Sequence, residues 1–405
     1  MRIGGIEMDY CSFFAFLGVN TPDQCFEEIY KSAREEYEDS GVFFLSDEYI
    51  IKVNSLYNSL SNCVNDLLVA AKNIKENKEL SVFALFVYRA MMNRTLFKSH
   101  LAEFNFPNGS GVEYDFLPLL ILVPTIEELS IKLKKRQIPE DIIGDTLKQY
   151  EDCVFLYKER EGIWGLSRGH FNHLQHYIDQ KFLNVGRLRF MVVDNFAVPI
   201  KAYKNAENKI VILFDNAQIN QMGLLKGTPP IEQEEECFLA DIQETDEYFE
   251  GYKADEEGLF SAQKVRLLKS EWELMLQRGH SVLSVHIPPN GALTEEICDA
   301  SYKRAKEVFE KYYPEFDFKC FYCHSWLLDS QLKNFLKEES NILRFQKKYC
   351  LFPGITEGRD VFTFVFKSQG VPIKDLPEQT SLQRAIKSHY LNGKYIYAMD
   401  GVFCI

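Results

Sequence analysis

Residues 280–326 read HSVLSVHIPPNGALTEEICDASYKRAKEVFEKYYPEFDFKCFYCHSW, and this stretch indicates the fold of the C-terminal half. Its first apolar run, residues 281–287, predicts a β-strand, and the PPNGAL loop follows it. Thr294 is the expected N-cap of a helix that ends at about residue 313, and residues 318–326 predict a second strand. A strand, a helix and a second strand in this order are typical of a mixed α/β domain.

The segments on either side extend this mixed pattern. On the N-terminal side the sequence predicts a helix at about 168–182, a strand pair at 186–203, a short strand at 209–216 and a hairpin at 246–268 around a DEEG turn. On the C-terminal side it predicts a short helix at 329–337 capped by Asp329, a hairpin formed by 342–352 and 360–368, a last helix at 380–391 and a terminal strand.

Residues 1 to about 160 have apolar side chains at three- and four-residue spacing, which predicts helices. The expected helices lie at 21–39, at 46–75 with Ser46 as N-cap, at 80–101, after a capping box formed by Thr125 and Glu128, and from Pro139 to about residue 158. The sequence therefore predicts an α+β protein, with an all-helical N-terminal domain at 1–165 and a mixed α/β domain at 166–405.

The composition narrows the classes of partner. The chain of 405 residues carries 46 Lys and Arg against 59 Asp and Glu, so its net charge is -13. Such a surface repels phosphate backbones and anionic lipids, which argues against nucleic-acid and membrane partners. The longest apolar run, FLPLLILVP at 116–124, is far shorter than the ~20 residues of a spanning helix, and the N-terminus shows no signal-peptide pattern. We therefore expect a cytoplasmic protein with reduced cysteines, and the oligomeric state stays open.

Several stretches of the chain resemble a known family. The order of strands and helices is similar to the central and C-terminal part of the GNAT-type N-acyltransferase fold. Bacterial proteins called acyltransferase domain-containing pair a helical N-terminal domain with a GNAT-like C-terminal domain. They resemble this chain at GIWGLSRGHFNHLQHYI (162–178), SEWELML (270–276), HIPPNGALT (286–294), CHSWLLDSQL (323–332) and SNILRFQKKY (340–349). The resemblance implies a GNAT-like acyltransferase domain at 166–405.

The resemblance also implies an activity. It points to an acyl-CoA-dependent N-acyltransferase that transfers an acyl group to an unidentified amine of a small molecule or peptide. Acetyl-CoA or another acyl-CoA is then the expected co-substrate, and no covalently bound cofactor is expected. The alternative is a non-catalytic GNAT-like binding or regulatory protein that has lost the CoA loop.

In the GNAT fold a splayed strand holds the acyl-CoA thioester, and the pyrophosphate lies at the N-terminus of the next helix, where N–H groups favour anions. The resemblance places this site at Ser284, Val285, Asn290, Gly291, Ala292 and Thr294. The loop departs from the family's Q/R-x-x-G-x-G/A pattern. PPNGALT has a single glycine and two prolines that donate no N–H, and Glu295 and Glu296 on the first helical turn repel a pyrophosphate.

An amine nucleophile must lose a proton, so a general base is expected beside the thioester carbon. His286, just before the loop, is the first candidate, and His324, at the end of the next strand, is the second. Tyr322 is a candidate general acid for the departing thiolate, with Ser325, Cys323 or water as alternatives. An ordinary hydrogen-bonded position in the sheet also accounts for each of these side chains.

The letters CFYCH at 320–324 contain C-x-x-C-H, a pattern of haem attachment, and C-x-x-C, a redox or zinc half-site. The haem interpretation is disfavoured because haem is attached in exported proteins and this sequence shows no export signal. The redox interpretation is disfavoured because a strand places residues i and i+3 on opposite faces. The zinc interpretation is disfavoured because the second pair of ligands is missing. His170, His173 and His176 follow at three-residue steps on a helix and do not converge on one ion. The leading expectation is therefore that the chain has no metal site. Redox or metal chemistry at Cys320 and Cys323 is kept as a third hypothesis, after the acyltransferase and the non-catalytic binding protein.

Overall fold

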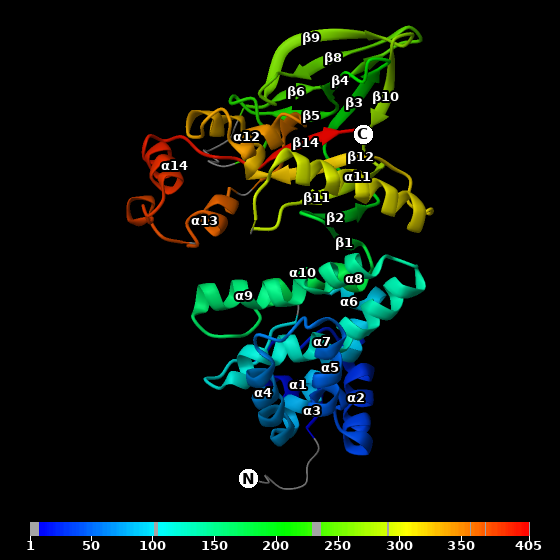
Figure 1. The fold of residues 1–405 in the computed structure, drawn as a ribbon, viewed down its shortest axis with the longest axis vertical. Helices are drawn as coiled ribbons and strands as arrows, with labels where there is room; N and C mark the ends of the chain where they lie inside the picture. The colour runs from blue at the N-terminus through cyan, green and yellow to red at the C-terminus, as the bar shows by residue number, and fades with distance from the viewer. Residues whose placement is uncertain are drawn as a thin grey trace. The chain divides into compact units, whose positions relative to one another are not determined.

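The computed structural model describes residues 8–100, 104–228, 236–289, 291–356, 358–368 and 370–404. Its internal contacts form two compact units, residues 1–181 and 182–405, coloured from blue to green and from green to red in Figure 1. Helices make up the first unit, and β-sheets with accompanying helices make up the second, which confirms the predicted α+β class. Within the described ranges, none of the helices is both long enough and apolar enough to span a membrane.

The first unit consists of helices joined by short connections. In chain order they are α1 (Tyr10–Phe16), η1 (Gln24–Phe26), α2 (Glu27–Ser40), η2 (Phe43–Leu45), α3 (Asp47–Tyr57), α4 (Val64–Glu76), α5 (Lys78–Met92), α6 (Arg94–Ser99), α7 (Val112–Lys135), α8 (Glu140–Leu147), α9 (Gln149–Glu161) and α10 (Arg168–Ile178). Helices α5 and α7 are buried over most of their length and form the centre of the unit.

Asparagines divide two of the predicted helices. Ser46 accepts a backbone N–H of the first turn as the predicted N-cap, but α3 ends where Asn58 adopts the left-handed φ of 55° and ψ of 29°. Asn93 likewise separates α5 from α6, and its side chain accepts a backbone N–H of α6. The predictions of single helices at 46–75 and 80–101 are therefore wrong, because asparagine tolerates the left-handed region and caps a following helix well.

The predicted capping box at Thr125 and Glu128 is wrong, because α7 runs through both residues. Thr125 Oγ1 donates to the carbonyl of Leu122 at 2.6 Å and lies 2.8 Å from the hydroxyl of Tyr150. The hydroxyl is thus satisfied inside the helix and against a neighbouring one, so it does not begin a new helix.

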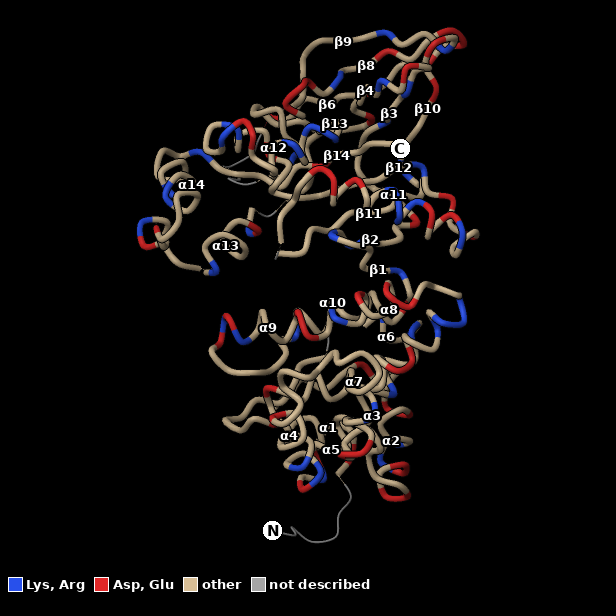
Figure 2. Tube along the Cα trace, viewed as in Figure 1, with Lys and Arg blue, Asp and Glu red and all other residues tan. Residues whose placement is uncertain are grey.

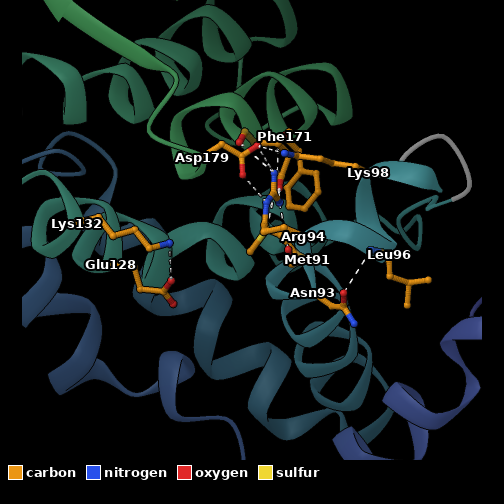
Figure 3. Close-up of polar contacts among 10 residues, drawn as sticks. Met91, Asn93, Arg94, Leu96, Lys98, Glu128, Lys132, Phe171 and Asp179 are labelled. Carbon is orange, nitrogen blue, oxygen red and sulfur yellow. Dashed lines mark hydrogen bonds and ion pairs between the residues drawn. The ribbon is translucent and has the colours of Figure 1, made fainter. Parts of the chain in front are cut away.

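Helix α10 belongs to the first unit, where Arg94 of α6 binds its C-terminal end (Figure 3). Arg94 Nε lies 2.9 Å from Asp179 Oδ1, and Nη1 donates to the side-chain carbonyl of Gln175 at 2.8 Å. Burial alone would raise the pKa of Asp179, but hydrogen bonds from Arg94 and Lys98 hold it below its usual value. The contacts thus divide the chain after α10, and the domain boundary at 165/166 stays a prediction.

The second unit contains a six-stranded central sheet in the order β1-β2-β11-β12-β14-β13. Its strands are β1 (Phe182–Val185), β2 (Leu188–Val193), β11 (Ser281–His286), β12 (Phe318–Ser325), β13 (Cys350–Pro353) and β14 (Met399–Phe403). Strands β11 and β12 run parallel and are joined by α11 (Glu295–Tyr312), as the sequence predicts. The other neighbouring strands of this sheet are antiparallel.

A second antiparallel sheet is inserted in the chain between β2 and β11. It consists of β3 (Ile200–Asn205), β4 (Ile210–Phe214), β7 (Gln243–Glu244), β8 (Tyr248–Ala254), β9 (Phe260–Leu268) and β10 (Trp272–Leu276), with β5 (Ala217–Ile219) and β6 (Phe238–Ala240) as a separate pair. The hairpin predicted at 246–268 is confirmed as β8 and β9. The strand pair predicted at 186–203 is wrong, because β2 lies in the central sheet and β3 in the second. Apolar side chains of both sheets form a shared core.

Between β12 and β14 the chain forms a small helical lobe with its own apolar core. Its elements are η3 (Trp326–Leu328), η4 (Ser330–Asn334), α12 (Asn341–Gln346), α13 (Asp360–Phe364), η5 (Ile373–Asp375) and α14 (Ser381–Leu391). Asp329 caps η4 as predicted, by accepting a backbone N–H at 2.9 Å. The hairpin predicted at 342–352 and 360–368 is wrong: β13 pairs with β14, and Val361 lies on α13 in the apolar core of the lobe. Short apolar runs suit either a strand or a buried helix, so packing decides between them.

Candidate functional site

The central sheet opens between the C-terminal ends of its two parallel strands. Pairing of β11 with β12 extends from Ser281 opposite Phe318 to Ser284 opposite Tyr322. Beyond these residues, β11 continues beside β2 and β12 continues beside β14. The two strands therefore diverge at the end where the chain enters the loop before α11.

One face of the sheet carries polar side chains at this opening. Side chains alternate along a strand and paired residues share a face. The register therefore places on one face Ser284, His286, Tyr322, His324 and Asp400. The opposite face is apolar and packs against α11, for example through the rings of Phe321 and Tyr302, whose centroids are 5.2 Å apart.

His324, Tyr322 and Asp400 form a hydrogen-bonded cluster on the polar face. Asp400 Oδ1 lies 2.6 Å from His324 Nδ1 and accepts the hydroxyl of Tyr322 at 2.9 Å. The side chain of Asp400 is 1% exposed, whereas that of His324 is 36% exposed. A buried carboxylate thus holds one ring nitrogen of an imidazole that stays partly accessible.

The carboxylate changes the protonation of its two neighbours. Burial by itself lowers the pKa of His324, but the hydrogen bond and the charge of Asp400 outweigh it and raise the pKa above the usual 6.5. For Tyr322, burial and then the same carboxylate raise the pKa well above the usual range of a phenol. At neutral pH Tyr322 therefore stays a hydrogen-bond donor, and His324 is the member of the cluster that exchanges a proton.

Gly354, which follows β13, leaves room for the pair of His324 and Asp400. A Cβ atom at this position would lie 2.8 Å from His324 Nδ1 and 2.9 Å from Asp400 Oδ1. Both distances are shorter than Cβ atoms adopt in folded proteins. A side chain at Gly354 would therefore displace the imidazole or the carboxylate.

His286 occupies a different environment on the neighbouring strand. Its Nε2 lies 3.3 Å from Ser284 Oγ, and its ring centroid lies 4.8 Å from that of Phe182. Strand pairing places Arg189 of β2 opposite it. The structure thus brings His286 together with Ser284 at the end of β11, on the same face as His324.

The loop before α11 holds the other residues predicted for CoA binding. Gly291 has a φ of +95°, which glycine adopts readily. The carbonyl of Ala292 accepts Nε of Arg187 at 2.9 Å. Thr294 occupies the predicted N-cap position of α11, although its side chain caps no backbone N–H there. Asn290 lies outside the described residues.

The two thiols of the C-x-x-C stretch lie on opposite faces of β12, as predicted. Cys320 belongs to the core shared by the two sheets, whereas Cys323 is fully buried near Tyr349. Burial raises the pKa of both thiols well above the usual range, which makes them poor nucleophiles and ligands. In the described parts of the chain, no group of three His, Cys, Asp or Glu side chains is arranged to hold a metal ion.

The sequence analysis missed three residues of this site: Asp400, Gly354 and Arg187. One signal was present for Asp400: it is the acidic residue of an otherwise apolar stretch, YAMDGVF at 397–403. A carboxylate in a buried strand requires a hydrogen-bonding partner. Gly354 and Arg187 carry no such local signal, because their contacts lie far away in the chain.

The second unit identifies the family. Residues 182–403 match the family model of the GNAT-like C-terminal domain, and the chain belongs to this family. The resemblance predicted from the sequence is thereby confirmed. No curated protein matches the chain.

Solved structures of similar fold are acyltransferases. A mutant of the acyltransferase orf11*, in complex with octanoyl-CoA, has 16% sequence identity and a TM-score of 0.62, and the match covers 98% of this chain and 100% of that one. An acyltransferase in complex with decanoyl-CoA has 18% identity and a TM-score of 0.62, with 98% and 99% covered. An acyltransferase in complex with decanoyl-CoA and teicoplanin has 16% identity and a TM-score of 0.61, with 98% and 99% covered. At these identities the matches show a common fold.

Proposed function

We propose that this protein is an acyl-CoA-dependent N-acyltransferase that transfers an acyl group to an amine of a small molecule or peptide. The observation that carries the proposal is the pair of His324 and Asp400 beside the divergence of β11 and β12. The family and the acyltransferases solved with octanoyl-CoA and decanoyl-CoA support an acyl-CoA donor. The acyltransferase solved with teicoplanin supports a small-molecule acceptor.

His324 acts as the general base in this proposal. An ionised carboxylate only accepts hydrogen bonds, so Nδ1 of His324 carries the proton that Asp400 binds. The lone pair of Nε2 is then available for a proton of the acceptor amine. Asp400 also stabilises the imidazolium that forms, as its effect on the pKa of His324 indicates.

The reaction balances with these groups. The amine nitrogen attacks the thioester carbonyl carbon, a C–N bond forms, and the carbonyl oxygen becomes an oxyanion as Nε2 of His324 takes the amine proton. The carbonyl then re-forms and the C–S bond breaks. The CoA thiolate takes the proton held by His324, or one from water, and the products are an amide and free CoA.

The remaining predicted residues receive supporting roles. Tyr322 positions Asp400 and is not the general acid, because its hydroxyl donates to the carboxylate and its pKa is raised far above neutrality. The donor is held by the end of β11 and the loop before α11, which includes Ser284, Val285, Asn290, Gly291, Ala292 and Thr294. His286 is the alternative base.

An assay of acyl transfer from decanoyl-CoA to a panel of amines tests this proposal. The release of the free CoA thiol measures the rate. His324→Gln is expected to lower kcat by about 10²–10⁴-fold, the usual contribution of a general base, with an unchanged Kd for decanoyl-CoA. The matched control is His286→Gln on the neighbouring strand, for which we expect a change of less than about threefold.

Each other outcome has a definite meaning. If His286→Gln loses activity and His324→Gln keeps it, the base is misassigned. If the wild-type protein binds decanoyl-CoA but acylates no amine, the alternative of a non-catalytic binding protein is favoured; the two prolines and two glutamates at the loop motivate this alternative. If the wild-type protein binds no acyl-CoA, the proposed function is wrong.

A further inference from the structure

The turn between β1 and β2 carries an arginine that binds the loop before α11. Arg187 Nε donates to the carbonyl of Ala292, and Nη2 donates to the carbonyls of Pro288 and Gly291, each at 2.9 Å. Three main-chain carbonyls thus converge on one guanidinium. Both ends of the loop are therefore tied to a residue about a hundred positions earlier in the chain.

Arg187 is itself fixed on α11. Its backbone N–H donates to Ser301 Oγ at 2.8 Å, and Ser301 is 2% exposed. Gly186 permits this close approach, because its φ is +63° and a Cβ atom there would lie 2.7 Å from Ser301 Oγ. The turn, the loop and the helix are thus connected through Arg187.

The carbonyl contacts determine where the N–H groups of the loop point. In a trans peptide unit the C=O and the N–H point in opposite directions. Because the carbonyls of Gly291 and Ala292 are bonded to the guanidinium, the N–H groups of Ala292 and Leu293 point away from Arg187. They precede the first N–H groups of α11 in the chain, which have no main-chain acceptor within the helix and favour anions. Among these, the N–H of Glu296 is bonded to the carboxylate of the same residue.

Arg187 also supplies a positive charge that the loop lacks. Residues 288–294 contain no Lys or Arg, and Glu295 and Glu296 follow on the first turn of α11. Nη1 of Arg187 is buried and makes no hydrogen bond with any residue that the structure describes. The guanidinium therefore adds a positive charge on the side of the loop opposite to its outward N–H groups, whereas Glu295 on the first turn of α11 lies 3.9 Å from Lys348 Nζ.

We propose that Arg187 is a positioning residue for the diphosphate of the acyl-CoA donor. It orients the loop N–H groups for the phosphates and adds a positive charge to a loop that has none of its own. This inference rests on the proposed function, since it takes acyl-CoA as the donor. It accounts for a loop whose own sequence departs from the usual phosphate-binding pattern.

Calorimetric titration of the full-length protein with decanoyl-CoA and with S-decanoyl-pantetheine tests this role, because the second compound lacks the phosphates. For Arg187→Gln we expect the Kd of decanoyl-CoA to rise about tenfold, as for the loss of one charge-assisted contact, and the Kd of S-decanoyl-pantetheine to change less than about twofold. Arg187→Lys keeps the charge but cannot bind three carbonyls, so an intermediate Kd is expected. The control is Arg304→Gln, which removes the same charge from an exposed position on α11.

The comparison of two donors separates this inference from the proposed function. A wild-type protein that binds neither compound contradicts the proposed function. A wild-type protein that binds both equally well, or an Arg187→Gln variant that is folded by circular dichroism and weakens both equally, overturns the inference alone. If Arg187→Gln fails to fold, Arg187→Lys decides: an unchanged ratio of the two Kd values overturns the inference.

Discussion

Asp400 is the residue on which the candidate site depends most. Its Oδ1 receives both His324 Nδ1 and the hydroxyl of Tyr322, so one buried carboxylate orients two side chains of the neighbouring strand. Such a carboxylate costs folding free energy unless it is hydrogen-bonded, and here its partners lie on the face where the sheet opens. Burial of this carboxylate lowers the folding free energy that the sheet would otherwise gain, and such groups are typical of functional sites.

Asp400→Asn tests this role through the pH dependence of acyl transfer. In the proposed mechanism the base is neutral imidazole, so wild-type kcat is expected to rise with pH through the pKa of His324, which Asp400 raises above the usual 6.5. The asparagine removes that charge, so the rise should move to lower pH and the plateau should fall by about 10²-fold. Steady-state rates across neutral pH measure both effects. The control is Asp375→Asn at an exposed position, and an unshifted profile in Asp400→Asn would contradict the assignment.

Gly354→Ala tests the geometry of the same pair without a change of charge. The added Cβ atom would lie 2.8 Å from His324 Nδ1, so the imidazole and the carboxylate must separate. We expect a loss of kcat of at least about tenfold, the lower end for a displaced general base. The matched control is Gly169→Ala, where the new atom would make an ordinary contact of 3.8 Å. Equal rates in both variants would show that the pair tolerates displacement.

At the scale of elements, caps and turns decide where helices begin and end. Ser46 caps α3 by accepting the N–H of Tyr49 at 3.3 Å and donates to the carbonyl of Phe43 at 3.0 Å. Asn58 ends the same helix in the left-handed region. The apolar periodicity continues past this point, so periodicity alone joins two helices that the backbone separates.

Ser46→Ala measures what the cap contributes to stability. Loss of an N-cap hydroxyl is expected to lower the free energy of unfolding by about 1 kcal/mol. Urea unfolding followed by circular dichroism provides the measurement. Ser55→Ala is the control, because this exposed serine lies inside α3 and its hydroxyl only bonds the carbonyl of Lys52. If both variants lose the same free energy, the capping bond is not the cause.

The charge of the whole molecule opposes an anionic donor. The net charge is -13, and acidic and basic residues are distributed over both units (Figure 2). Long-range repulsion is screened by salt, because the Debye length falls to about 10 Å at 0.1 M, whereas a contact with a partly buried arginine is screened less. The net charge and Arg187 therefore act on the donor at different distances.

The association rate of acyl-CoA should for this reason rise as salt increases from about 10 mM to about 150 mM. Stopped-flow fluorescence with a labelled decanoyl-CoA provides the rates. A labelled S-decanoyl-pantetheine is the control, because it carries no phosphate and its rate should stay constant. A fall in the rate for the CoA ester would show that a local basic field, and not the net charge, governs the encounter.

Local patterns in the sequence predicted the α+β class, the strand–loop–helix–strand order at 280–326, and the caps at Ser46 and Asp329. These features depend on residues that are close in the chain, so propensity and periodicity report them. His324 was a candidate for the same reason, since it ends a recognisable strand. The strand pair at 186–203 and the hairpin at 342–368 were wrong because distant packing overrides such patterns. The long helices were wrong because apolar periodicity does not report the local stops at Asn58 and Asn93.

Only the tertiary structure brought Asp400 to His324 and Arg187 to the loop before α11. The first contact requires β14 to pair with β12 in one register, because a shift by one residue would turn Asp400 to the other face. The second requires the β1–β2 turn to lie against Ser301 of α11. Both contacts join segments far apart in the chain, so no local pattern contains them. The sequence by itself therefore determined the α+β class, the elements at 280–326 and His324 as a candidate, and the tertiary structure decided which side chains lie beside each candidate residue.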